Sequence, residues 1–329
     1  MYEEMDFEEV VESALDEAQD LPLELLSMLS GMMPDETGIF VERWSLTPAS
    51  RRLLLLQALV ELAESSFEMD FGFIFRHCMN DEDDEVRTTA LQGLWEDESA
   101  SLVEPLVAML LEDPSARVRE EAAASLGRFA LLAELGDLGA RHARLIKEAL
   151  LAVVSEQEGV PQVRRRAIES IAFLSVEGLR QIIDESYASD DRLLRVSALL
   201  AMGRSADSFW EGIVITELSS EDAELRYHAA RACGELATRE AVPVLARLVE
   251  DRDRDVQMAA IWALGQIGGA AARRTLESCY DSEDERLQER AEEALAEIRL
   301  AEGALDVGVF ESDQEQAPQG EGLGWDLES

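Results

Sequence analysis

An internal repeat of about 31 residues is the feature that most limits what this chain can fold into. Each copy has an apolar residue, an alanine four positions later and a further apolar residue after another four; we number these positions 0, +4 and +8. Four successive intervals are 31 residues each. Such a period is typical of architectures in which each copy is one supersecondary unit. Strong copies begin at Val86, Val118, Val163, Leu194, Leu225, Val256 and Leu287, and a fainter one at Leu54.

Each copy is predicted to be a pair of helices. Apolar residues at 0, +4 and +8 fall on one stripe of a helix. The alanine at +4 allows a neighbouring helix to approach closely, and the glycine at +9 in several copies either does the same or ends the helix. A shorter apolar helix precedes a tight acidic turn, as in residues 241–249. Such a pair buries its apolar side only in a stack. The turns supply the expected helix N-caps Asp83, Ser115, Asp191, Asp222, Asp253 and Asp284.

The frame Asp-x-x-Val-Arg-x-x-Ala-Ala-x-Ala-Leu-Gly resembles the short HEAT repeat named after the phycobilisome lyases, over roughly residues 50–300. This resemblance implies an all-α fold, a right-handed α-solenoid of about eight helix pairs. The resemblance does not single out one function, since such repeats build adaptors, chaperone-like factors and some enzymes.

Three segments are expected along the chain. Residues 1–49 are acidic, contain helical apolar spacing and suit an N-terminal helical cap, residues 50–300 form the solenoid, and residues 301–329 form an acidic, flexible tail. Trp325 in that tail is either a recognition motif or a chance exposed residue. The step from Val118 to Val163 is 45 residues. We expect its excess near residues 131–140, as a longer helix or a surface loop.

The charge is strongly acidic, with 70 acidic against 29 basic residues and a net charge of −41. It either keeps a long surface soluble or recruits a basic partner, and a nucleic-acid mimic is a weaker idea. Such a field disfavours nucleic acid and anionic membranes as partners. Three widely spaced cysteines fit a reducing compartment, and the acidic N-terminus does not resemble a signal peptide, so a cytoplasmic location is expected.

One neighbourhood is locally basic. It comprises Arg141, His142, Arg144 and Lys147, followed by Arg164, Arg165 and Arg166. These residues either pair with acids on adjacent helices or form a docking patch for an anionic group.

Catalytic signatures are missing from the sequence. None of the three histidines is followed by glutamate, and there is no H-E-x-x-H, C-x-x-C, P-loop or G-x-S-x-G motif. Residues 251–255 resemble the start of a calcium loop, but Val256 and Trp262 stand where glycine and glutamate are needed. We therefore expect no enzyme activity, no cofactor and no metal.

The candidate site is a row of side chains at positions +2 and +6, on one side of the second helix of three successive copies. Consensus repeats usually have polar groups there, whereas this row is apolar and aromatic. Its residue types are enriched at interfaces. We interpret it as a concave surface that binds a protein or peptide; packing between repeats is the competing interpretation. The alternative function is a subunit of a bilin lyase, isomerase or chaperone that acts on a chromophore-bearing protein. The candidate residues are Val196, Leu200, Arg204, Tyr227, His228, Arg231, Met258, Trp262 and Gln266.

Overall fold

The computed structural model describes residues 5–66, 68–156 and 159–314, with side chains up to residue 302. Within these ranges the regular elements are α-helices and short 3₁₀-helices, with no strand. The chain divides into two compact units, Met1–Ala201 and Met202–Ser329, and each is described by itself. The predicted all-α class is confirmed.

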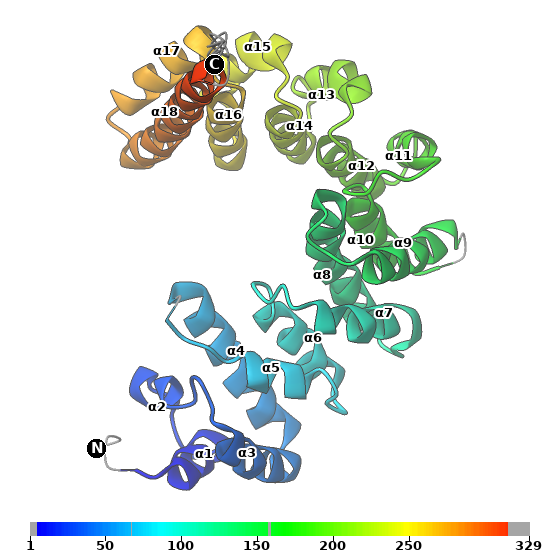
Figure 1. Ribbon diagram of the computed structural model, residues 1–329, viewed down its shortest axis with the longest axis vertical. Coiled ribbons are helices and arrows are strands. Elements are labelled where there is room, and N and C mark those ends of the chain that lie inside the picture. Colours follow the sequence, from blue (N-terminus) through cyan, green and yellow to red (C-terminus); the bar gives the residue numbers. More distant parts are fainter. Residues whose placement is uncertain (1–4, 67, 157–158, 315–329) are drawn as a thin grey trace, which may run out of the picture. The chain divides into compact units, whose positions relative to one another are not determined.

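The first unit begins with three helices that precede the regular pairs (Figure 1). Helices α4, α6, α8 and α10 pack one against the next, while α7 packs against α9 in a second row. The predicted second helices of the repeats thus form one continuous layer of this unit. The helices are α1 (Phe7–Leu15), α2 (Leu23–Ser27), α3 (Pro34–Leu46), α4 (Ala49–Ser65), α5 (Gly72–Cys78), α6 (Asp84–Gly93), α7 (Val103–Glu112), α8 (Ala116–Leu135), α9 (Ala140–Ser155), α10 (Pro161–Ile171), α11 (Leu179–Tyr187) and α12 (Arg192–Arg204), whose last residues belong to the second unit.

The second unit repeats the arrangement. Helices α14, α16 and α18 lie side by side, and α13, α15 and α17 each pack on the partner that follows them. The stripe residues Ala229, Ala260 and Ala291, all at position +4, are fully buried between these layers. The helices are α13 (Glu211–Glu217), α14 (Ala223–Glu235), α15 (Val242–Leu248), α16 (Arg254–Ile267), α17 (Gly269–Tyr280) and α18 (Glu285–Gln314).

The predicted N-caps are confirmed with one exception. The carboxylates of the five aspartates each accept a hydrogen bond from a backbone N–H in the first turn, as Asp253 does from Asp255 and Val256. Ser115 stands at the N-cap position of α8, but its hydroxyl donates instead to Asp84, 2.6 Å away. The hydroxyl is turned toward Asp84 of the preceding repeat and accepts no hydrogen bond from the first turn of its own helix.

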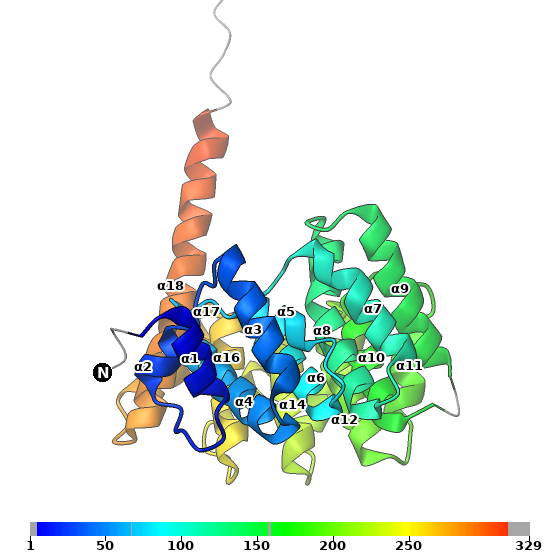
Figure 2. The same ribbon diagram turned by 90° about the horizontal axis from the view of Figure 1, so that it is seen from below.

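At three irregular places the structure settles the details. The longer helix expected near residues 131–140 is confirmed, since α8 continues to Leu135, whereas the fainter copy and the start of the tail differ from expectation. The fainter copy begins at Leu55 and not at Leu54. Leu54 is 50% exposed, while Leu55 and Leu59 are buried. The copy therefore begins 31 residues before Val86. The 45-residue step is accommodated by long helices, α8 with 20 residues and α9 with 16. Helix α18 continues through Gln314, past the expected start of the tail, and Figure 2 shows it extending beyond α16 and α17. Trp325 lies outside the described residues.

Candidate functional site on helices α14 and α16

The +2 and +6 side chains of the second unit lie on two adjacent helices. Tyr227 and Arg231 come from α14, and Met258 and Trp262 from α16, and all four are half-buried. Helical spacing of four residues places each pair on one side of its helix, and α14 and α16 pack closely along their length. We call these four residues the α14–α16 row.

The centre of this row is a stacked pair. The guanidinium carbon of Arg231 lies 3.5 Å from the centroid of the Trp262 ring, which is a close cation–π contact. The indole also lies against Gly234, where an added methyl group would be 2.5 Å from Cζ3 of Trp262. The glycine at +9 therefore makes room for an aromatic ring of the next repeat. The ring thus contacts both Arg231 and Gly234 of the adjacent helix.

A half-buried carboxylate adjoins the stack. Glu235, at position +10 of α14, has its Oε1 4.0 Å from Nη2 of Arg231, and its Oε2 is buried without a hydrogen bond. Burial raises the pKa of Glu235, while the charges of Arg204 and Arg231 oppose that shift. Sequence reasoning missed Glu235, although its place one turn after Arg231 is a signal that could have found it.

The remaining predicted residues are distributed as follows. His228 is half-buried on α14 beside Tyr227, with the two ring centroids 4.9 Å apart. Gln266 is exposed on α16 and donates a hydrogen bond to Glu297. Arg204 is half-buried at the end of α12. The structure thus brings Arg204, Tyr227, His228, Arg231, Met258, Trp262 and Gln266 together in one unit. Val196 and Leu200, respectively buried and half-buried, belong to the other unit.

Several members of the locally basic neighbourhood form ion pairs within the first unit. Arg141 lies 2.7 Å from Glu104, and Arg166 pairs with Glu169 at 2.9 Å. Arg164 donates from Nε to the carbonyl of Val154. The pairs of Arg141 with Glu104 and of Arg166 with Glu120, 3.4 Å apart, join adjacent helices, as the first interpretation expects, whereas Arg164 is bonded to a carbonyl.

The suspected calcium loop has a structural explanation. The carboxylate of Asp251 accepts two hydrogen bonds from Arg226, which lower the pKa of Asp251, and Asp253 caps α16. Among the described residues, no group of three or more histidine, cysteine, aspartate or glutamate side chains is placed to hold a metal ion. In the same part of the chain, no helix combines the length and apolarity needed to span a bilayer.

Several solved structures resemble this chain at low sequence identity. The chain is similar to yeast importin-beta, at 13% identity over 94% of this chain and 48% of that one, with a TM-score of 0.48. It is also similar to the complex of CpcE and CpcF of phycocyanin lyase from a Nostoc species, at 15% identity over 69% of this chain and 94% of that one, with a TM-score of 0.45. Human deoxyhypusine hydroxylase matches at 17% identity over 89% and 96%, with a TM-score of 0.36.

No curated protein matches the sequence. The family model for HEAT repeats matches residues 74–152 and 213–296. These segments include the helix pairs α7/α8 and α15/α16, whose frames carry the 0, +4 and +8 pattern. The two matched segments are therefore HEAT repeats built from stacked helix pairs.

Proposed function

We propose that this chain is a non-catalytic scaffold that binds a partner protein or peptide on the α14–α16 row. The observation that carries the proposal is the stack of Arg231 on Trp262, a half-buried cation–π pair where consensus repeats have polar groups. Tryptophan, tyrosine and arginine dominate the energetics of protein interfaces. A ring that is already held by Gly234 and Arg231 loses little rotamer freedom on binding, which favours affinity.

The charge of the chain favours a basic partner. A net charge of −41 accelerates the approach of positively charged proteins and opposes the approach of nucleic acid or anionic lipid. Within the row itself, Arg231 is held near Glu235, so the row presents aromatic area and no isolated cation. We therefore expect affinity to come from the aromatic contacts and the rate of association from the surrounding acids.

A photo-crosslinking amino acid at Met258 tests where a partner binds. The matched control carries the same group at Ala246, which is half-buried on α15 in the other layer of the same unit. Crosslinked proteins from the native organism are identified by mass spectrometry, and the partner captured only from position 258 is then purified. Equal capture from both positions would contradict a site on the row.

Direct titration with that purified partner decides the role of the aromatic residues. Trp262→Ala and Tyr227→Ala should each weaken binding by about 30-fold, which corresponds to about 2 kcal/mol at an interface hot spot. Tyr280→Ala is the matched control, because Tyr280 is 46% exposed on α17. Circular dichroism and thermal melting confirm folding. If the two row variants fold and bind as the parent does, the row is not the site.

A further inference from the structure

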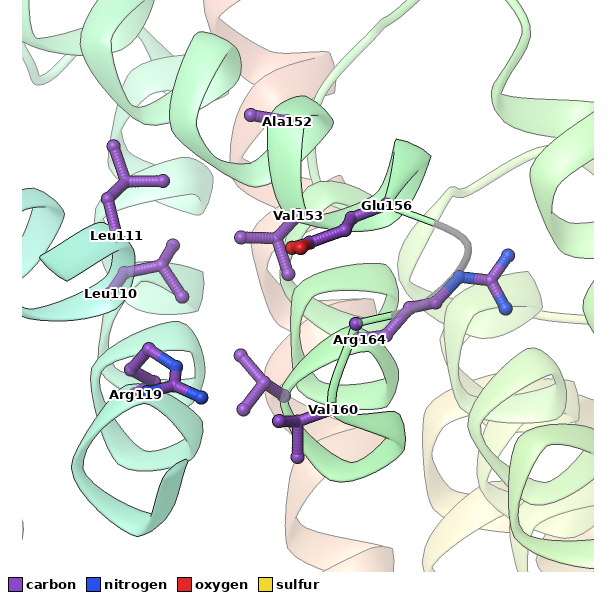
Figure 3. Close-up of a pocket in the computed structure, with 10 residues that line it drawn as sticks. Leu110, Leu111, Arg119, Ala152, Val153, Glu156, Val160 and Arg164 are labelled. Carbon is purple, nitrogen blue, oxygen red and sulfur yellow. The ribbon is translucent and has the colours of Figure 1, made fainter. Parts of the chain in front are cut away.

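The last turns of α8 set this helix apart from the other second helices of the repeat. It ends at Leu135, position +17, whereas α14 and α16 end at positions +10 and +11. In its first half, Figure 3 shows Arg119 beside Leu110 of α7, across a pocket from Val153 of α9. By contrast, residues 131–135 are all exposed or half-buried. The added turns therefore do not extend the fully buried core.

Two large apolar side chains stand on these added turns. Leu131 is 39% exposed and Leu135 is 65% exposed. Their spacing of four residues places them on one side of α8. Ala124 and Arg128, at positions +6 and +10, continue that side toward the start of the helix, opposite the buried stripe at 0, +4 and +8. Packing within the chain therefore does not account for the two leucines.

The added turns are anchored to the rest of the unit. The carboxylate of Glu134 accepts hydrogen bonds from the backbone N–H of Ser175 at 3.0 Å and from its hydroxyl at 2.5 Å. These bonds lower the pKa of Glu134 and so favour its charged form. At the end of the helix, Gly136 has φ of +86° and the N–H of Asp137 donates to the carbonyl of Leu132. The two leucines thus stand on an ordered, closed helix end.

A third exposed apolar side chain adjoins this side of α8. Trp95 follows α6, which packs against α8, and is 44% exposed. Its carbonyl accepts a hydrogen bond from Nη1 of Arg128 at 2.9 Å, and Arg128 lies one turn before Leu131. We call Trp95, Arg128, Leu131 and Leu135 the α8 patch. Exposed apolar side chains that are grouped in this way mark interaction surfaces.

The border of the α8 patch is acidic. Glu96 and Glu98 directly follow Trp95, and Asp137 follows the end of α8; all three are exposed. Within the part of the chain that the structure describes, Glu96 and Asp137 form no ion pair. Their charges are therefore available to a partner. An apolar centre with acids on its border complements apolar residues that are flanked by lysine or arginine.

Nearby cations do not cancel this acidic border. Burial lowers the pKa of Arg128, while the charges of Asp97 and Glu98 oppose that shift, so carboxylates already offset this cation. Arg141, in the first turn of α9, lies 2.7 Å from Glu104 of α7 and is paired in the row of first helices.

We propose that the α8 patch binds a basic amphipathic helix of a partner protein. The apolar face of that helix packs on Trp95, Leu131 and Leu135, and its lysines or arginines face the bordering acids. A helix suits this surface because its apolar residues recur every three or four positions, the spacing of Leu131 and Leu135. A second copy of the chain would add another net charge of −41, which opposes such pairing. The patch lies in the first unit and does not depend on the α14–α16 row.

Fluorescence anisotropy with two labelled peptides tests the proposal on the full chain. The probe is an amphipathic helix of leucine and lysine, about 14 residues long, or roughly four turns. The second peptide has the same composition in an order that distributes the leucines around the helix. At about 0.15 M salt, which screens general attraction to the acidic surface, the probe should bind at least about 10-fold more tightly. Both peptides carry the same charge, so the difference measures the apolar face.

Variants of the chain locate the binding site of the probe. Leu131→Gln/Leu135→Gln should weaken binding by about 10-fold or more, the effect expected when even one leucine contact is lost. Glutamine keeps the helix propensity of leucine, and circular dichroism checks folding. Leu46→Gln/Leu54→Gln is the matched control, since both leucines are at least half exposed on α3 and α4 of the same unit. This control should bind the probe as the parent does.

A second pair of variants tests the acidic border. Glu96→Gln/Asp137→Asn should weaken binding of the probe by about 3-fold, the value of exposed ion pairs, and should reduce its dependence on salt. Glu61→Gln/Glu64→Gln removes the same charge from the exposed side of α4 and should leave the affinity near that of the parent.

Several results would overturn the proposal. They are equal binding of the two peptides, absence of binding, and an equal loss in the control variants. If Trp262→Ala abolishes binding while Leu131→Gln/Leu135→Gln does not, the probe binds the α14–α16 row instead. Self-association of the parent in sedimentation velocity that Leu131→Gln/Leu135→Gln abolishes would make a second copy the occupant. Binding to phosphatidylcholine vesicles that the same variant abolishes would assign the patch to a lipid surface.

Discussion

The indole of Trp262 on α16 covers Gly234 on α14, so that a methyl group at position 234 would lie 2.5 Å from Cζ3 and 3.0 Å from Cε3 of the ring. The same methyl group would lie 3.0 Å from the backbone of Ala263. The ring and the backbone therefore exclude a side chain from both directions. The glycine at +9 is thus a packing requirement in this repeat and not a helix stop, because α14 continues to Glu235.

Gly234→Ala should lower the free energy of unfolding by about 1–3 kcal/mol, the usual cost of overpacking a tight contact. Gly212→Ala in α13 is the control, since nothing lies within 4 Å of its added methyl group. This control should be neutral or slightly stabilising, by up to about 1 kcal/mol. Denaturant titration by circular dichroism measures both. A Gly234→Ala variant as stable as the parent would show that the ring moves aside freely.

Ala237→Gly should stabilise the chain by up to about 1 kcal/mol, because Ala237 has φ of +50°. It follows α14 in a Schellman motif, in which the N–H of Thr238 donates to Cys233 and that of Ala237 donates to Gly234. Glycine adopts this conformation without the steric penalty of a Cβ atom.

The contrasting variant for this prediction is Ala124→Gly on the exposed surface of α8. There the same substitution should destabilise the chain by about 1 kcal/mol, because the backbone is helical. Thermal or denaturant unfolding of the two variants should therefore shift in opposite directions. Loss of stability in Ala237→Gly would refute the argument from backbone strain.

The fold could be predicted because it is repeated. Val118, Ala122 and Leu126 bury one stripe as expected, and the same spacing recurs often enough to outweigh any single misleading residue. The fainter copy shows the limit of prediction from sequence. Positions 54 and 55 are both leucine, and only the packing shows that Leu55 is the buried one. Local pattern fixes the type of element, whereas its register is decided by neighbouring helices.

The candidate site could be located but not described from the sequence. Positions +2 and +6 place Arg231 and Trp262 on adjacent helices, yet their stacking depends on the approach of α14 to α16. Glu235 was missed for a related reason, because its burial is set by Gly203 and by the two nearby arginines.

Glu235→Gln should stabilise the chain more at neutral pH than at acidic pH. Burial raises the pKa of Glu235 above its ordinary value near 4.5, so the folded state holds the proton more tightly than the unfolded state. The stabilisation from this tighter proton binding is complete below the pKa of Glu235 in the unfolded state. It is lost as pH rises through the pKa of Glu235 in the folded state. Glutamine does not titrate, so the difference in unfolding free energy between variant and parent should grow with pH across this window.

Asp251→Asn should change the free energy of unfolding with the opposite pH dependence. Hydrogen bonds from Arg226 lower the pKa of Asp251, so its contribution is present above the unfolded pKa and is lost as pH falls through the folded pKa. The penalty of Asp251→Asn should therefore shrink toward acidic pH. Urea titrations at several pH values measure both differences. Parallel pH profiles for the two variants would contradict the assignment of their environments.

Asp253→Ala should lower the free energy of unfolding by about 1 kcal/mol, and Ser115→Ala should lower it by much less. Both residues stand at the N-cap of a second helix, but only Asp253 accepts hydrogen bonds from that helix, from Asp255 and Val256. Asp253→Asn keeps the acceptor and should recover most of the loss.

The two cap variants also differ in a way that stability alone does not report. The hydroxyl of Ser115 donates to Asp84 and lowers the pKa of that carboxyl, so Ser115→Ala should raise the pKa of Asp84. Titration of the Asp84 carboxyl by NMR checks this shift, with Asp253→Ala as the variant that leaves it unchanged. An unchanged pKa in Ser115→Ala, or a stability loss equal to that of Asp253→Ala, would mean that Ser115 caps its own helix in solution. The contact between adjacent repeats would then be secondary to the local cap.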